Sequence, residues 1–203
     1  MSKEISFKIK SAFEESINLK KIILKDELFT VLEKCGTLIA NSISEGGKLM
    51  TCGNGGSAAD AQHLAAELLV RLTSQVNRKG LPAISLCQDI STLTATINDF
   101  SGEDIFSRNL LTLSKPGDVL MALSTSGNSP NIVKTLKFAK EINLTTIGFL
   151  GSQGGESLRY CDEAFIVPSN ITARIQEIHI TAGHATLQFV EDKLLKEGFI
   201  NRL

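Results

Sequence analysis

A buried strand, a glycine-rich turn and a helix follow one another directly around residues 51–67, and this succession constrains the fold more than any other feature. The apolar run Lys48–Cys52 predicts a strand, and the alanine-rich segment Ser57–Leu72 predicts a helix. The intervening Cys-Gly-Asn-Gly-Gly-Ser motif lets the chain turn sharply and brings bare backbone close to a ligand. Because Ser57 can cap the helix and the first N–H groups are free, the turn predicts an anion site.

Further along the same helix, His63 and Glu67 stand four residues apart. That spacing turns them by about 40° around the helix axis, so their side chains share one face. Taken alone, such a pair is more often a solvated or locally bonded helix pair than a catalytic one. The predicted helix nevertheless offers an anion-binding site at its N-terminus and an imidazole–carboxylate pair further along it.

The rest of the chain alternates strands with helices. Further strands are expected at 80–86, 118–123, 144–150 and 164–167, and further helices at 129–142 and 173–197. This alternation predicts an α/β fold with a doubly wound, five-stranded parallel sheet and helices on both faces. We expect residues 1–203 to form a single domain, with residues 1–45 as an N-terminal helical extension.

Residues 3–45 precede the first strand and are expected to form two helices. Apolar residues recur at helical spacing in the first, and the second covers about residues 27–44 before Gly46-Gly47. Two helices before the first strand are more than a doubly wound sheet needs. We therefore expect their apolar faces to pack on a partner subunit in an oligomer; the alternative is that they fold back over their own sheet.

Composition narrows the classes of function. A formal net charge of −1 over 203 residues argues against a nucleic-acid-binding surface, and no apolar run approaches the roughly 20 residues of a membrane span. The four cysteines are widely spread without a C-x-x-C pair, which is typical of buried, reduced thiols. The first residues lack the apolar core of a signal peptide. We expect a cytoplasmic protein with neither a membrane nor a nucleic acid as partner.

The serine-rich loop Ser124–Ser129, Ser-Thr-Ser-Gly-Asn-Ser, follows an apolar strand and enters a helix at Pro130. Ligands of parallel sheets bind beyond the carboxyl ends of the strands, where this loop falls. Its four hydroxyl groups and the N–H groups of a helix N-terminus can bind a phosphomonoester without a lysine or arginine. The alternative is a hydroxyl-rich turn with a capping serine, which is common.

Two other motifs carry weaker signals. The first glycine-rich turn lacks the Gly-Lys-Ser/Thr ending of a P-loop, and it matches the dinucleotide pattern only through Gly53, Gly55 and Ala58. No acidic residue stands at the distance needed to hold a ribose. Asn98 and Asp99 are expected in a loop between helices, where exposed polar residues often serve function; a plain turn is the alternative.

The last helix carries polar groups in an otherwise apolar sequence. Such groups need partners when the helix is buried. Gln176 and His184 are eight residues apart and near enough in angle to serve one site, whereas His179 faces elsewhere. With His63 and Glu67 they would supply two imidazoles, a carboxylate and an amide oxygen, which suit zinc or another borderline divalent ion. The alternative is a hydrogen-bonded polar seam without a metal.

Together these motifs resemble a known family. The serine-rich loop and the strand order are similar to the sugar-isomerase (SIS) domain, whose signature many phosphosugar binders share. Over nearly the whole chain the sequence resembles phosphoheptose isomerases, through Cys52-Gly-Asn-Gly-Gly-Ser57, His63-x-x-x-Glu67, Asn98-Asp-Phe100, Asp104-Ile-Phe-Ser-Arg108, and Arg174-Ile-Gln-Glu-Ile-His179 with His184. The set of His63, Glu67, Gln176 and His184 is far more specific than the SIS signature.

The resemblance implies a flavodoxin-like homotetramer whose active sites lie between subunits, with a sugar phosphate as substrate and one Zn²⁺ per subunit. The implied zinc ligands are His63, Glu67, Gln176 and His184. The implied phosphate contacts are Ser124, Thr125, Ser126 and Ser129. The expected contacts with the rest of the substrate are Asn54, Gly55, Gly56, Ser57, Glu67, Asn98, Asp99 and Gln176.

The implied activity converts sedoheptulose 7-phosphate to D-glycero-D-manno-heptose 7-phosphate, which feeds heptose synthesis for lipopolysaccharide or other bacterial surface glycans. Such a conversion moves a proton between C1 and C2 through an enediolate and needs a base, an acid and a group that holds the oxyanion. We assign Glu67 as the base at C1 and His184 as its acid–base partner, with zinc polarising the carbonyl. Glu67 then has the awkward double role of ligand and base.

Two other functions stay open at this point. Some relatives with the same fold are adaptors that bind the bacterial replication initiator and lack the acidic and second-histidine positions; residues 11–16 and 57–63 look somewhat like theirs. Because this chain keeps Glu67 and His184, the enzyme is favoured. A phosphosugar sensor without catalysis would keep the serine-rich loop and need no metal, so metal content separates it from the enzyme.

Overall fold

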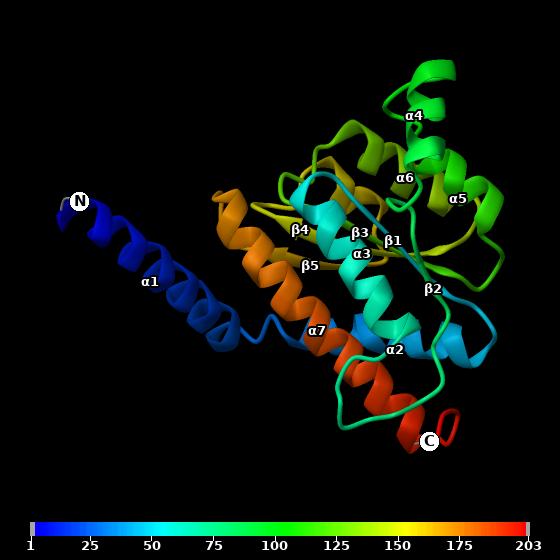
Figure 1. Cartoon of the computed structure of the whole chain (residues 1–203), viewed down its shortest axis with the longest axis horizontal. Helices are drawn as coiled ribbons and strands as arrows, with labels where there is room; N and C mark the ends of the chain where they lie inside the picture. Colours follow the sequence, from blue (N-terminus) through cyan, green and yellow to red (C-terminus); the bar gives the residue numbers. More distant parts are fainter. Residues whose placement is uncertain (1–2, 202–203) are drawn as a thin grey trace.

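The computed structural model describes residues 3–201 (Figure 1). Two helices, α1 (Lys3–Lys25) and α2 (Thr30–Ser44), precede the first strand. The strands are β1 (Leu49–Gly53), β2 (Ala83–Ser85), β3 (Val119–Ser124), β4 (Thr145–Gly151) and β5 (Glu163–Val167). The remaining helices are α3 (Gly56–Leu69), α4 (Ile90–Asp99), α5 (Ser107–Leu113), α6 (Pro130–Glu141), the short 3-10 helix η1 (Glu156–Tyr160) and α7 (Thr172–Lys196). None of the helices in this described part is both long and apolar enough to cross a membrane.

All five strands are parallel and lie in the order β2-β1-β3-β4-β5. This is a doubly wound order with its switch point between β1 and β3, so the predicted fold class is confirmed. β1 and β3 are buried along their whole length, because helices cover both faces of the sheet. The strand predicted at 80–86 is shorter than expected: Ala83–Ser85 pairs with β1, and Pro82 before it has no N–H to donate to the sheet.

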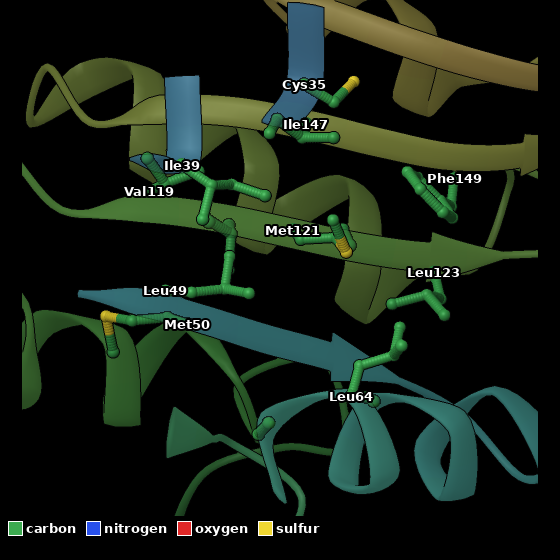
Figure 2. Packing of buried hydrophobic residues seen from close by; sticks show 14 of the residues in the cluster. Cys35, Ile39, Leu49, Met50, Leu64, Val119, Met121, Leu123, Ile147 and Phe149 are labelled. Carbon is green, nitrogen blue, oxygen red and sulfur yellow. The ribbon is translucent and has the colours of Figure 1, made fainter. Parts of the chain in front are cut away.

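Helices α2, α3 and α7 form one layer on the sheet, and α5 and α6 cover the other side. Figure 2 shows Ile39 of α2 and Leu64 of α3 directed at the strands. The expectation of a partner-facing apolar side is therefore wrong for α2, whose buried apolar residues are Leu32, Cys35, Ile39, Ala40 and Ile43. The reason is that α2 has one apolar stripe and can bury it against only one surface. Here that surface is formed by β5 and α7 of the same chain.

Helix α1 extends away from the body of the molecule toward its N-terminus (Figure 1). Leu19 and Ile23 pack its last turns into the core, and the side chain of Arg174 on α7 donates to the carbonyl of Ala12. Three apolar side chains at helical spacing stay largely exposed: Ile9 at 58%, Phe13 at 69% and Ile17 at 51%. Such a row is unfavourable in water, so contact of α1 with a partner subunit stays a prediction.

The loop that was predicted to contain Asn98 and Asp99 begins after them. Asn98 and Asp99 form the last turn of α4, which starts where the Asp89 carboxylate accepts a hydrogen bond from the Ser91 N–H at 3.0 Å. This cap and the partly buried Leu93 favour a helix over the whole segment. In Figure 1, α4 stands out from the body of the molecule.

Candidate active site

Helices α3 and α7 lie side by side and run in the same direction, which places the predicted site residues opposite one another (Figure 1). They pack tightly at Gly183, where a Cβ atom would lie 2.6 Å from Leu64 Cδ2. Leu64 and Gly183 are the direct neighbours of His63 and His184. The absence of a side chain at 183 therefore allows the two imidazoles to meet.

Three of the four predicted metal ligands converge between these helices. His63 Nε2 lies 2.8 Å from His184 Nε2 and 3.3 Å from Glu67 Oε1. One ligand atom from each of the three residues lies within 4.8 Å of the others. The Glu67 side chain is 16% exposed and that of His63 47%, so the group opens to solvent on one side. It lines an open hollow of about 510 Å³ whose other walls are Leu72, Thr73, Ala185 and Gln188.

The chemistry of this group fits a borderline divalent cation. Two imidazole nitrogens and one carboxylate are a common protein set at catalytic zinc sites, which leave a further position for substrate. The second carboxylate oxygen, Glu67 Oε2, is buried and has no hydrogen-bond partner among the described residues. A buried carboxylate oxygen without a donor is unfavourable, and a cation beside it would remove that penalty.

The fourth predicted ligand, Gln176, has its carboxamide at the N-terminal end of α3. A Cβ atom on Gly56 would lie 2.6 Å from Gln176 Nε2. Gly56 precedes His63 by seven residues, roughly 10 Å of helix. Gln176 therefore lies beside the glycine-rich turn, a position that is compatible with its predicted contact with substrate. Its role as a metal ligand stays a prediction.

Asp60 escapes the sequence prediction although it stands one turn before His63 on α3. Burial raises the pKa of the Asp60 carboxyl above its usual range, and the nearby imidazoles of His63 and His184 oppose that rise. Its Oδ2 is buried without a hydrogen-bond partner in the part of the chain that the structure describes. The only signal in the sequence is the i, i+3 spacing to His63, which many surface helices share.

The glycine-rich turn and the serine-rich loop meet at the carboxyl edge of the sheet. β1 and β3 are neighbours, with Gly53 paired to Leu123. The side chains of Asn54 and Asn131 exchange two hydrogen bonds, each from Nδ2 to the other's Oδ1, at 2.8 and 2.9 Å. This amide pair fixes the predicted sugar contact Asn54 beside α6. Asn131 was not predictable, because its partner lies 77 residues away in the sequence.

The start of α3 differs from the predicted one. The helix begins at Gly56 with Gly55 at the cap position, so Ser57 lies inside the first turn and does not cap it. The φ of Gly55 is +55°, a conformation that side-chain-bearing residues rarely adopt, and it lets the chain enter the helix early. Ser57 is buried, whereas Gly55 and Gly56 are exposed. A ligand can therefore reach the turn at the backbone of these two glycines and at Asn54, which is also exposed.

The serine-rich loop is organised by its own hydroxyl groups. Ser124 Oγ accepts a hydrogen bond from the Gly127 N–H at 3.1 Å, and Ser126 Oγ accepts one from the N–H two residues on, also at 3.1 Å. Both hydroxyls keep their own protons to donate to a ligand. Thr125 and Ser129 are half-buried, and Ser129 is the cap residue of α6. The four predicted phosphate contacts thus share one short loop.

Replacing Gly127 with alanine is expected to weaken sugar phosphate binding. The φ of Gly127 is +65°, and a Cβ atom there would lie 2.0 Å from the carbonyl oxygen of Gly154. Both backbones are hydrogen-bonded: the Ser157 N–H donates to the Gly127 carbonyl at 2.8 Å, and the Gly154 N–H donates to the Gly151 carbonyl at 2.9 Å. Backbone strain of this kind costs on the order of 1–3 kcal/mol, so KM for a sugar phosphate should rise by about tenfold or more.

Gly117→Ala is the matched control for this variant. Its φ is +90°, and an added Cβ meets no atom within 4 Å, so it introduces the backbone strain without the clash. Steady-state kinetics of the two variants should show a raised KM in Gly127→Ala alone. An unchanged KM in Gly127→Ala would remove the loop from the substrate site.

His179 lies away from the three-residue group, in agreement with its predicted angle. Its ring is buried next to Phe149, and its Nε2–H donates to the carbonyl of Leu150 at 3.1 Å. Nδ1 is buried and has no partner among the described residues. Burial lowers the pKa of His179 to about 4, and the hydrogen bond to Leu150 opposes that shift. His179 is therefore a neutral residue of the core.

This buried imidazole predicts a stability that falls in acid. Between pH 6.5 and 4 the unfolded chain protonates His179 and the folded chain does not, so stability decreases as pH falls through this window. The expected loss between pH 7 and pH 5 is about 2 kcal/mol. Urea unfolding of metal-free wild type and of His179→Gln, which keeps a donor for Leu150, measures it. Between pH 7 and pH 5, the free energy of unfolding of His179→Gln should fall by about 2 kcal/mol less than that of wild type. Equal losses in the two proteins would contradict a buried, neutral His179.

Asn98 and Asp99 are predicted to contact the sugar, but within one chain they do not lie next to the three-residue group. Both are exposed at the end of α4, where Asn98 Nδ2 donates to Asp99 Oδ1 at 2.7 Å. Helix α4 stands apart from α3 and α7 in Figure 1. Their contact with substrate stays a prediction.

The cysteines take no part in the site. All four are free; Cys35, Cys52 and Cys87 are buried and Cys161 is half-buried. Burial raises the pKa of Cys35 and of Cys161 to about 12. Thiols of this kind stay protonated at neutral pH and are unreactive, which agrees with their predicted role as core residues.

Known proteins resemble this chain over most of its length. The family model described as SIS domain matches residues 13–151. A phosphoheptose isomerase of Clostridium acetobutylicum is 46% identical over 190 residues, covering 93% of this chain and 96% of that protein. One of Paramagnetospirillum magneticum is 53% identical over 151 residues, covering 74% of this chain and 78% of that protein. The solved phosphoheptose isomerase of Neisseria gonorrhoeae is 36% identical, with a TM-score of 0.86 over 93% of this chain and 99% of its own. The chain therefore belongs to the SIS domain family and, within it, to the phosphoheptose isomerases.

Proposed function

We propose that this chain interconverts sedoheptulose 7-phosphate and D-glycero-D-manno-heptose 7-phosphate with the help of a divalent metal ion, zinc first of all. Membership of the family supports the substrate and the isomerase activity. The observation that carries the proposal is the group of His63, Glu67 and His184, with ligand atoms within 4.8 Å of one another. A sensor or an adaptor that only binds a sugar phosphate has no need of such a group.

Glu67 is the base of the reaction. Isomerisation removes a proton from C1 of the ketose and delivers one to C2, and the Glu67 carboxylate carries it. Its two oxygens have different surroundings: Oε1 lies 3.3 Å from His63 Nε2, and Oε2 is buried without a hydrogen-bond partner among the described residues. One oxygen can face the cation while the other takes the proton. The double role of ligand and base is therefore compatible with this carboxylate.

His184 moves the second proton. The hydroxyl proton on O1 of the ketose must leave, and the oxygen on C2 must gain one, as the enediolate passes to the aldose. An imidazole has two ring nitrogens, each of which can accept or donate a proton, which suits this transfer. When bound, the cation supplies polarisation of the carbonyl and stabilises the developing oxyanion.

The substrate spans the site from the serine-rich loop to His63. Ser124, Thr125, Ser126 and Ser129 donate to the phosphate, and the N-terminus of α6 adds its dipole. From Gly56 to His63, α3 covers roughly 10 Å, a span that an extended seven-carbon sugar phosphate can bridge. Asn54, Gly55, Gly56 and Gln176 lie near the start of that span and contact the sugar.

We further propose that the chain forms a homotetramer in the cytoplasm, with active sites between the subunits. Its product would enter heptose synthesis for bacterial surface glycans. The exposed row of Ile9, Phe13 and Ile17 on α1 supports a subunit contact. Asn98 and Asp99 on α4 then contact sugar bound by a neighbouring subunit. Sedimentation equilibrium tests the assembly: a tetramer is expected, and a monomer at micromolar concentration would contradict it.

The activity is tested by NMR with sedoheptulose 7-phosphate in D₂O and the metal-loaded protein. We expect heptose 7-phosphate to form, with deuterium at C2 where the base exchanges its proton with solvent. Tight binding of the sugar phosphate without any turnover would favour the sensor or adaptor instead. The serine-rich loop serves binding in either case, so binding alone does not support the enzyme.

A further inference from the structure

Arg78 and Glu191 form an ion pair whose two side chains are fully buried. Arg78 Nε donates to Glu191 Oε2 at 2.5 Å. The other guanidinium nitrogens donate to main-chain carbonyls: Nη1 to Leu68 at 2.9 Å and Nη2 to Glu67 at 3.1 Å. These carbonyls belong to the last turn of α3, where a helix leaves its carbonyl groups without intrahelical partners.

The pair joins the two helices of the active site next to the three-residue group. On α3, Arg78 holds the main-chain carbonyl of Glu67 itself. On α7, Glu191 stands seven residues after His184, which is two turns along and within about 20° of the same face. The ion pair therefore fixes the axial position of Glu67 against α7. The contact of Leu64 with Gly183 fixes the distance between the same helices.

We propose that Arg78 and Glu191 are positioning residues, which hold Glu67 in register with His184 and so set the geometry of the metal-binding group. This inference rests on the proposed function, which gives that group its role. Arg78 reaches acceptors on both helices with one rigid, planar group, which a lysine cannot do.

Stability alone explains the pair poorly. Apolar residues often replace a buried ion pair without loss of stability, because desolvation offsets the attraction between the charges. Here one oxygen, Glu191 Oε1, is buried without a hydrogen-bond partner among the described residues, which weakens the pair further as a stabilising element. Its geometric effect on α3 and α7 does not depend on net stabilisation.

The test compares this pair with a second ion pair, which joins the segments before β1 and β3 instead of α3 and α7. Lys48 Nζ lies 2.5 Å from Asp118 Oδ2, and the Asp118 side chain is fully buried just before β3, at the amino edge. Arg78→Met is matched by Lys48→Met, and Glu191→Gln by Asp118→Asn. Each variant removes one charge from an ion pair, and only the first pair joins α3 to α7.

Three measurements report the geometry of the group. These are Co²⁺ titration of metal-free protein, steady-state kcat and KM, and ring-nitrogen NMR of His63 and His184 without metal, which detects their 2.8 Å contact. Arg78→Met should weaken Co²⁺ binding and lower kcat by about tenfold or more each, with KM within about threefold of wild type. The hydrogen bond between the histidines should be lost. Glu191→Gln, whose amide oxygen still accepts from Arg78 Nε, should lie between this variant and wild type.

The controls decide between positioning and general destabilisation. Lys48→Met and Asp118→Asn should match wild type in all three measurements, even where they unfold at lower temperature. Wild-type Co²⁺ affinity and kcat in folded Arg78→Met would overturn the inference, and so would equal losses in Lys48→Met. If Arg78→Met does not fold, a wild-type Co²⁺ affinity in Glu191→Gln overturns it.

Failure of the proposed function is distinguishable from failure of this inference. If wild-type protein neither binds Co²⁺ nor turns over the sugar phosphate, the proposed function is wrong. The NMR signal of the histidine contact in metal-free protein then still decides whether Arg78 and Glu191 hold α3 in register with α7.

Discussion

Glu67→Gln is expected to lower kcat by roughly 10³-fold while the sugar phosphate still binds within about threefold of wild type. Glutamine nearly preserves the volume of glutamate but cannot take the proton from C1. It also places a neutral amide where a carboxylate lies 3.3 Å from His63, so metal binding weakens as well. The serine-rich loop is untouched, so phosphate binding persists. Steady-state kinetics and calorimetric titration with the sugar phosphate measure the two effects.

Glu163→Gln controls for the loss of a half-buried carboxylate. The Glu163 side chain is 29% exposed on β5 and lies 3.9 Å from Lys34, away from the site. Its kcat should stay close to that of wild type. Near-full activity of Glu67→Gln would show that another group is the base.

Gly183→Val is expected to abolish metal binding and to lower kcat by about two orders of magnitude or more. A Cβ atom alone would lie 2.6 Å from Leu64 Cδ2, and Leu64 is fully buried. Helices α3 and α7 must therefore separate, and the ring nitrogens of His63 and His184 separate with them. Overpacking also costs about 1–3 kcal/mol of unfolding free energy. Co²⁺ titration and thermal unfolding measure the two losses.

Gly36→Val overpacks the other side of α7 and serves as the matched control. A Cβ atom on Gly36 of α2 would lie 2.6 Å from Phe189 Cδ1 of α7. We expect a comparable loss of unfolding free energy with Co²⁺ affinity unchanged. Equal loss of affinity in both variants would mean that destabilisation, rather than separation of α3 from α7, removes the metal.

The three-residue group of His63, Glu67 and His184 was predictable because the signals that identify its members are local. Helical spacing places His63 and Glu67 on one face, and a chain with three histidines leaves few alternatives for the partner. The contacts that support the group are not local: Asn54 pairs with Asn131 across 77 residues, and Arg78 pairs with Glu191 across 113. Periodicity carries no information about such pairs, which depend on which elements become neighbours.

The fold class followed from the alternation of apolar runs with helical segments, and the errors fell at the ends of elements. Each was decided by one local property: the missing N–H of Pro82, the positive φ of Gly55, and the side-chain cap that Asp89 gives to α4. The N-terminal helices differ for another reason. Their apolar stripes look alike in sequence, and only tertiary packing decides that α2 buries its stripe while Phe13 on α1 stays exposed.

The central claim is that a metal ion held by His63, Glu67 and His184 serves the isomerisation of a sugar phosphate. The most direct test is turnover of sedoheptulose 7-phosphate before and after metal removal, with metal content measured on the same samples. We predict one divalent ion per subunit, loss of turnover on chelation, and recovery when Zn²⁺ is returned. Full turnover in protein stripped of metal would contradict the claim.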